Sequence, residues 1–165
     1  MTVSFETMTM EHCKEVMDIF NYYIENSFAA YMEQKLPYEF FGKIMEMSKG
    51  YPSYIIKDES TQKIVGFCYL RAYYPMPAFR HTAEVSYFIS REETGKGIGK
   101  KALTKLEQEA AHIGIKHLLA SISSRNEQSL MFHGNNGFKE CGRLHEVGVK
   151  KGEPFDVVWM EKDIN

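Results

Sequence analysis

Residues 84–110 read EVSYFISREETGKGIGKKALTKLEQEA, and the central elements of the fold can be predicted from them. Its first part is rich in strand-forming side chains, and its last part has a helical spacing that continues to Ile113. Glycines occupy alternate positions between the two parts. Such glycines leave backbone N–H groups uncovered at the positive end of a helix dipole. The stretch therefore predicts a strand, an anion-binding turn and a helix.

A phosphate group is the anion that fits this turn. The missing side chains let phosphate oxygens approach the backbone, and nearby lysines add positive charge. The residues expected to contact the anion are Gly95, Lys96, Gly97, Ile98, Gly99 and Lys100, with Lys101 beside them. The alternative is a plain glycine turn next to a solvated face of lysines.

Two common nucleotide-binding motifs do not fit the turn. A P-loop requires glycine at the position of Thr94 and serine or threonine at the position of Lys101. A dinucleotide-binding fingerprint that starts at Gly95 requires glycine at the position of Lys100. We therefore reject a P-loop and a dinucleotide-binding fingerprint, and we retain a phosphate group as the expected anion.

The rest of the chain alternates between strand and helix patterns. Helices are expected at 9–24, 37–50, 98–113 and 126–137. Strands are expected at 3–5, 53–57, 63–74, 82–90, 116–123, 138–149 and 154–164. The prediction is one α/β domain over residues 1–165, with a mixed, mainly antiparallel central sheet flanked by helices.

Composition excludes several classes of partner. The net charge of −2 gives no basic footprint for nucleic acid. No window approaches the roughly 18 to 20 apolar residues of a membrane span, and the first residues do not resemble a signal peptide. Cys13, Cys68 and Cys141 fit no metal spacing and are expected to be reduced thiols. We expect a cytoplasmic protein that binds no metal, nucleic acid or membrane.

Several segments together resemble one enzyme family. TGKGIGKKAL (94–103) resembles the pyrophosphate loop of the GNAT (GCN5-related N-acetyltransferase) family, although Thr94 stands where Gln or Arg is usual. The phosphinothricin and methionine sulfone acetyltransferase branch is similar over nearly the whole chain. The matching segments are DIFNYYIENS (18–27), RHTAEVSYFIS (80–90), SRNEQSLMFHGNNGF (124–138) and EVGVKKGEPFDVVWMEKDI (146–164).

This resemblance implies the GNAT fold, acetyl-CoA as co-substrate, and direct attack of an amine on the thioester. It also implies that an extended cofactor arm pairs with the backbone of Tyr87, Phe88 and Ile89, and that Asn126 contacts the cofactor. His133 matches a position that gives a proton to the leaving thiolate. The alternative for His133 is a histidine satisfied within a helix interface, and Asn126 also suits a helix cap.

Glu84 is the candidate general base. It lies inside an apolar strand, where partial loss of water would raise its pKa toward a useful value. The matching glutamate is the proposed base in the resembled branch, acting directly or through water. The alternative is a strand glutamate that faces solvent or pairs with an arginine.

Three residues are candidates for binding the acceptor. Arg71 and Arg80 flank the loop AYYPMPAF close to Glu84, and arginine binds carboxylates through two hydrogen bonds. The resemblance adds Tyr31, in the irregular stretch after the first helix. Plain surface ion pairs are the alternative for both arginines.

The sequence thus predicts an enzyme that moves acetyl from acetyl-CoA to the amino group of a small amino-acid-like molecule. Phosphinothricin, methionine sulfoximine and methionine sulfone are the acceptors that the resemblance implies, and it also implies a homodimer. Two alternatives stay open: a protein or polyamine N-acetyltransferase, and a non-catalytic acyl-CoA sensor.

Overall fold

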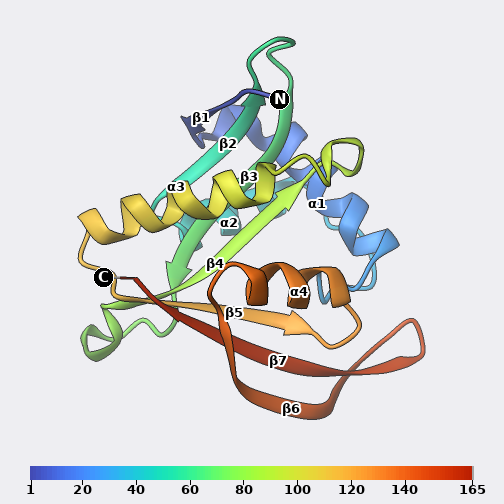
Figure 1. Ribbon diagram of the computed structural model, residues 1–165. Helices are drawn as coiled ribbons and strands as arrows, with labels where there is room; N and C mark the ends of the chain where they lie inside the picture. The colour runs from blue at the N-terminus through green and yellow to red at the C-terminus, as the bar shows by residue number, and fades with distance from the viewer. Residues whose placement is uncertain (165) are drawn as a thin grey trace.

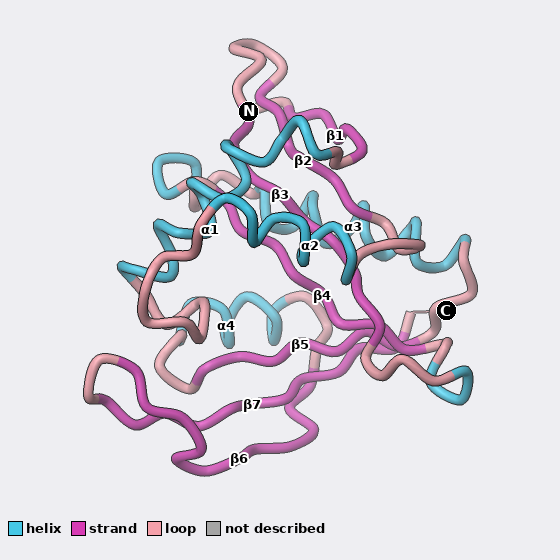
Figure 2. Tube along the Cα trace, turned by 180° about the vertical axis from the view of Figure 1, so that it is seen from behind, coloured by secondary structure: helices cyan, strands magenta, loops and turns pink. Residues whose placement is uncertain are grey.

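The computed structural model describes residues 1–164 and shows a sheet between two layers of helices (Figure 1). The helices are α1 (Cys13–Asn26), α2 (Phe41–Met47), α3 (Ile98–His112) and α4 (Glu127–Asn135). The strands are β1 (Val3–Thr7), β2 (Ser53–Asp58), β3 (Ile64–Ala72), β4 (Thr82–Ile89), β5 (His117–Ser123), β6 (Lys139–Lys150) and β7 (Glu153–Asp163). Helices α3 and α4 cover one face of the sheet, and Figure 2 shows α1 and α2 on the other.

The sheet has seven strands in the order β1-β2-β3-β4-β5-β7-β6. Every neighbouring pair is antiparallel except β4 and β5, which run parallel. The expected mixed α/β fold with a mainly antiparallel sheet is confirmed.

The parallel pair is short. β4 and β5 pair only where Thr82 to Glu84 lie beside His117 to Leu119. Beyond this point β4 continues to pair with β3 as far as Ile89, and β5 continues to pair with β7 as far as Ser123. The two strands therefore separate after Glu84 and Leu119, and we call this point the fork.

Two apolar cores hold the helices against the sheet. One core packs Ala102 and Leu106 of α3 against the sheet, and the other packs Met17 of α1 with Phe67 of β3. The side chains of β4 alternate between the two cores, as a strand requires. Tyr87 packs on the α3 side and Phe88 on the α1 side.

Two helix starts differ from the sequence-based expectation. Thr9 precedes a short 3₁₀ turn, Met10–His12, so α1 begins only at Cys13. Pro37 likewise precedes a 3₁₀ turn, Tyr38–Phe40, before α2. Tight turns of this kind are common at helix starts, and the hydrophobic spacing alone does not distinguish them from the first turn of an α-helix.

Candidate active site

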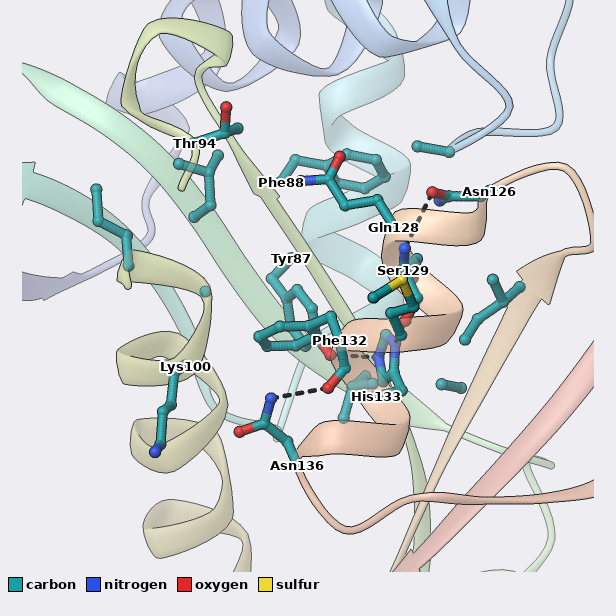
Figure 3. A pocket seen from close by; sticks show the side chains of 18 of the residues that line it. Tyr87, Phe88, Thr94, Lys100, Asn126, Gln128, Ser129, Phe132, His133 and Asn136 are labelled. Atoms are coloured by element: carbon teal, nitrogen blue, oxygen red, sulfur yellow. Dashed lines mark hydrogen bonds between the residues drawn. The ribbon is translucent and has the colours of Figure 1, made fainter. Parts of the chain in front are cut away.

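A cleft of about 630 Å³ opens where β4 and β5 separate (Figure 3). Its lining comes from four segments of the chain: residues 85–89 of β4, the glycine turn and start of α3, residues 120–123 of β5, and α4 with its flanking residues. Tyr23 of α1 and Ala29 complete it. Separation of the strands thus creates an opening that runs through the middle of the sheet.

The glycine turn forms one end of the cleft. Gly95 and Gly97 have φ angles of +78° and +80°, in the left-handed region that favours glycine. Gly97 is the N-cap of α3, so the amide groups that follow it have no partner within the helix. Open N–H groups at the positive end of a helix suit a phosphate.

The lysines of this turn differ in what they contact. Lys100 lines the cleft. Lys96 instead forms a 2.6 Å ion pair with Glu93, and Lys101 Nζ donates to the carbonyl of Met1 at 2.9 Å. The Thr94 hydroxyl donates to the carbonyl of Arg91. Three lysines were expected around the anion, but only Lys100 lines the cleft, since Lys96 is paired with Glu93 of the cleft wall and Lys101 bonds to the first residue of the chain.

The edge of β4 that faces the cleft carries backbone groups with no strand partner among the described residues. Tyr87, Phe88 and Ile89 line the cleft from this edge. One of their carbonyl groups is occupied, because the Tyr23 hydroxyl donates to the oxygen of Ile89. Alternate residues of β4 direct their N–H and C=O groups to β3, and those that instead face the cleft can pair with an extended ligand as a strand would.

Asn126 lines the cleft and also caps α4. Its side-chain oxygen accepts a hydrogen bond from the backbone N–H of Ser129 at 3.2 Å (Figure 3). The amide nitrogen of Asn126 has no protein partner among the described contacts, so a cap and a ligand contact are compatible.

His133 is buried at the wall of the cleft and is held on both sides. Its Nδ1 lies 2.7 Å from the carbonyl oxygen of Ser129, which can only accept, so Nδ1 carries the proton. The Nε2 then accepts a hydrogen bond from the hydroxyl of Tyr87, whose ring also stacks on the imidazole. Burial lowers the pKa of His133 and favours the neutral ring. In this arrangement the ring has no free N–H for a thiolate.

Glu84 is the last residue of β4 before the fork, and only 9% of its surface is exposed. It lies directly across from Arg71 on β3, and Arg71 Nη2 is 3.4 Å from Glu84 Oε1. Burial raises the pKa of the Glu84 carboxyl, and the charge and hydrogen bond of Arg71 oppose this change. The carboxylate of Glu84 is therefore desolvated, as expected of a general base, and it also pairs with an arginine, as the alternative predicted.

The guanidinium group of Arg71 does not use all of its hydrogen-bond donors. Its contact with Glu84 is long for a charge-assisted hydrogen bond, and its Nη1 reaches only the sulfur of Met47 at 3.5 Å. The Nε atom is buried with no hydrogen-bond partner among the described residues. Arg80 is different: it is exposed and donates to the carbonyl of Pro77 within its own loop. The structure therefore brings Arg71, and not Arg80, to the glutamate.

Tyr31 reaches the same side of the sheet from the segment after α1. Its hydroxyl lies 2.8 Å from Ser121 Oγ on β5, and its ring stacks on Phe155. Burial raises the pKa of this hydroxyl, and its hydrogen bond with Ser121 acts in the opposite direction. Tyr31 is thus held against β5, two residues beyond the end of its pairing with β4.

The cleft thus contains most of the residues predicted to bind the cofactor. All of them except Lys96 line it. Sequence reasoning missed several others, and β5 and α4 carry most of these: Ser121, Ser123, Gln128, Ser129, Phe132 and Asn136. The alternation of β5 could have suggested its serines, whereas the facing residues of α4 depend on how that helix packs.

Two negative observations apply to residues 1–164. No helix in this range is both long and apolar enough to cross a membrane. No group of three or more His, Cys, Asp or Glu side chains in it could hold a metal ion.

Residues 5–159 match the Acetyltransferase (GNAT) domain family. The chain belongs to this family. It is 31% identical to an L-amino acid N-acyltransferase of Escherichia coli K12 and 30% identical to an L-methionine sulfoximine/L-methionine sulfone acetyltransferase of Salmonella typhimurium LT2. Each match extends over 116 residues and covers 70% of this chain, with 66% and 67% of the respective relative.

A solved structure supports the same conclusion. The phosphinothricin acetyltransferase of Sinorhizobium meliloti, in complex with acetyl-CoA, is 26% identical and superposes with a TM-score of 0.92. The match covers 100% of this chain and 90% of that protein. These matches confirm the expected fold and the expected class of acetyl-transferring enzyme. They also confirm acetyl-CoA as the co-substrate of this family.

Substitution of Gly97 tests the anion-binding turn. Gly97→Ala leaves enough space for the new methyl group, so its effect is conformational. A left-handed residue with a side chain costs about 1–2 kcal/mol, and the turn can relieve this strain by withdrawing its N–H groups. We expect the dissociation constant for acetyl-CoA, measured by titration calorimetry, to rise about tenfold.

Gly134→Ala is the matched control, because Gly134 has open space and an ordinary helical backbone in α4. Acetyl-CoA affinity should not change in this variant. Equal affinities in the wild type and the Gly97 variant would contradict the assignment of the turn.

Proposed function

We propose that this protein transfers the acetyl group of acetyl-CoA to the amino group of a small amino-acid-like acceptor. One observation carries the proposal: a desolvated carboxylate, Glu84, stands at the fork, next to Val85, the first residue of β4 that lines the cleft. A thioester laid along the cleft would present its carbonyl carbon close to this base. Proximity of the two substrates then supplies much of the catalysis.

The cofactor would lie with its phosphates on the glycine turn and its extended arm along β4. Gly95, Gly97 and Lys100 provide the anion site, and the uncovered edge of β4 pairs with the arm. A backbone N–H of this edge would polarise the thioester carbonyl as negative charge develops on its oxygen. Asn126 would add a side-chain contact from the start of α4.

Glu84 would act as the general base, directly or through a water molecule. The acceptor arrives as an ammonium ion and must lose one proton before its nitrogen can attack the thioester carbon. A second proton leaves the nitrogen when the amide forms, and it balances the departing thiolate. We assign His133 to holding the hydroxyl of Tyr87, because its own N–H is bound to Ser129.

Arg71 would bind a carboxylate of the acceptor. It lies beside the base, and its guanidinium has a buried N–H without a partner and weak contacts elsewhere. Tyr31 closes the same side, and its hydroxyl contacts Ser121. An arginine and aromatic side chains suit an amino acid better than a polyamine, whose positive charges would be repelled. The names of the relatives point to phosphinothricin, methionine sulfoximine or methionine sulfone as acceptors.

Thiol release from acetyl-CoA tests this function. The wild type should turn over L-methionine sulfone or phosphinothricin and leave spermidine unchanged. Glu84→Gln keeps the size of the side chain but cannot accept the proton, so kcat should fall by about 10²–10⁴ with an unchanged affinity for acetyl-CoA. Tight acetyl-CoA binding without turnover of any acceptor would support a sensor instead. Full activity of the variant would remove Glu84 as the base.

The pH profile separates the effect of Arg71 on the base from its effect on binding. Arg71 lowers the pKa of Glu84, so Arg71→Met should raise it and move the acidic limb of log(kcat/KM) to higher pH. The maximum of kcat/KM should fall as well, because acceptor binding weakens. The pH at the midpoint of the acidic limb does not depend on this weaker binding. Arg80→Met is the control and should keep the wild-type midpoint, since Arg80 contacts only its own loop. An unmoved midpoint in the Arg71 variant would contradict the coupling.

We further propose a homodimer that uses the outer strand of the sheet. β6 ends the sheet, and Leu144, Val147 and Val149 on it are 50%, 57% and 64% exposed. Apolar side chains on an unpaired edge strand favour association with another chain. Sedimentation velocity should show a dimer for the wild type and a monomer for Val147→Lys. A monomeric wild type at micromolar concentration would contradict this assembly.

We also propose that the protein is a single domain and that it is located in the reducing cytoplasm. The cysteines Cys13, Cys68 and Cys141 are all free, which suits a compartment that keeps thiols reduced. Cell fractionation would test the location, and recovery of the protein outside the cytoplasm would contradict it.

A further inference from the structure

Lys150, the last residue of β6, is a buried lysine. Only 1% of its surface is exposed. Its Nζ donates to the backbone carbonyl oxygens of Ser27 and Ala30, at 2.7 Å each. No carboxylate among the described residues forms a salt bridge with it. The ammonium group is therefore held by two carbonyl groups of a distant part of the chain.

Burial of an ammonium group without a carboxylate partner is unfavourable, and burial lowers the pKa of Lys150 accordingly. A methionine would fill a similar volume without this cost. What lysine adds is a set of N–H donors at the end of a long chain, and two of them have acceptors here. The two hydrogen bonds are thus the feature that distinguishes this side chain from an apolar one.

Both carbonyl groups belong to the segment between α1 and the 3₁₀ turn before α2. Residues 27–36 of this segment form neither helix nor strand, so no ladder of backbone hydrogen bonds fixes them. Asn21 holds the far end of the segment through the backbone N–H and C=O of Leu36. Lys150 holds the near end, and the two anchors leave little freedom between them.

The residues next to the Lys150 contacts face the site. Ala29 lies between Ser27 and Ala30 and lines the cleft. Tyr31 follows Ala30 and contacts Ser121, a residue of β5 that lines the cleft close to the fork. A small displacement of the two anchored carbonyl groups would therefore move both the wall of the cleft and the aromatic side chain at the fork.

We propose that Lys150 is a positioning residue for the acceptor: its hydrogen bonds to Ser27 and Ala30 set the place of Tyr31 against Ser121, next to the fork. This role rests on the proposed function, in which the acceptor binds at the fork. It deepens that function, because it links the end of β6 to acceptor binding without contact between Lys150 and either substrate. Acetyl-CoA binding depends mainly on the glycine turn and β4. From the segment that Lys150 holds, only Ala29 lines the cleft, so the affinity for acetyl-CoA should change little.

Lys150→Met removes the donors and keeps an apolar side chain of similar size. We expect the KM for L-methionine sulfone to rise about tenfold, since a misplaced contact at a reacting site is costly. The dissociation constant for acetyl-CoA should stay within about twofold of the wild type, because nothing at the cofactor end has changed. Lys151→Met is the matched control. Lys151 is an exposed neighbour that contacts the carbonyl of Glu25, and its variant should keep both constants.

A double-variant cycle tests whether Lys150 acts through Tyr31. Tyr31→Phe removes the contact with Ser121, and combining it with Lys150→Met should add little to the larger single effect. Fully additive effects on the acceptor KM would overturn the proposed route. An unchanged acceptor KM in Lys150→Met, or an equal loss of acetyl-CoA affinity, would overturn the role itself.

Three further outcomes are also decisive. If Lys150→Met does not fold, Lys150→Gln is measured instead. Its nitrogen lies one bond nearer the backbone and cannot replace both hydrogen bonds of the ammonium group, so the acceptor KM should still rise. An acceptor KM equal to that of the wild type would then overturn the proposal. A wild type that turns over no acceptor would refute the proposed function, and this role with it. An active wild type with an unaffected Lys150 variant would refute only the role of Lys150.

Discussion

The short pairing between β4 and β5 is the constraint on which the site depends. These strands share only the residues from Thr82 to Glu84 on one side and from His117 to Leu119 on the other. Backbone groups of a strand normally need partners, so a strand edge left open inside a sheet is a position prepared for a ligand. The cleft exists because the sheet stops pairing at this point, and Glu84 is the last paired residue before it on β4.

The two ends of the cleft have different chemistry. At one end, Gly97 starts α3 and exposes N–H groups to which Lys100 adds charge, which suits a phosphate. At the other end, Glu84 is desolvated beside Arg71, which suits proton transfer next to a bound anion. An extended thioester cofactor has its charge and its reactive carbon at opposite ends. The cleft therefore matches the distribution of groups on acetyl-CoA as well as its shape.

Local patterns in the sequence were sufficient for the central elements. The strand around Glu84, the glycine turn and α3 follow each other directly along the chain, and the sequence predicts all three. Glycine in the left-handed region at positions 95 and 97 also follows from the residue type.

Contacts between distant segments could not be predicted in this way. Arg71 and Arg80 are equivalent in the sequence, and only the register of β3 against β4 places Arg71 across from Glu84. Lys96 pairs with Glu93, Lys101 bonds to the carbonyl of Met1, and Lys150 reaches a segment 120 residues away. The opening between β4 and β5 depends on which strands become neighbours, which no local pattern encodes.

The sharpest test is a crystal structure of the protein with both coenzyme A and L-methionine sulfone. We expect the pyrophosphate on the turn at Gly97, the arm along β4, and the amino nitrogen of the acceptor within about 3 Å of Glu84 or joined to it by one water. The carboxylate of the acceptor should contact Arg71. An acceptor bound away from the fork, or a cofactor outside the opening between β4 and β5, would contradict the account.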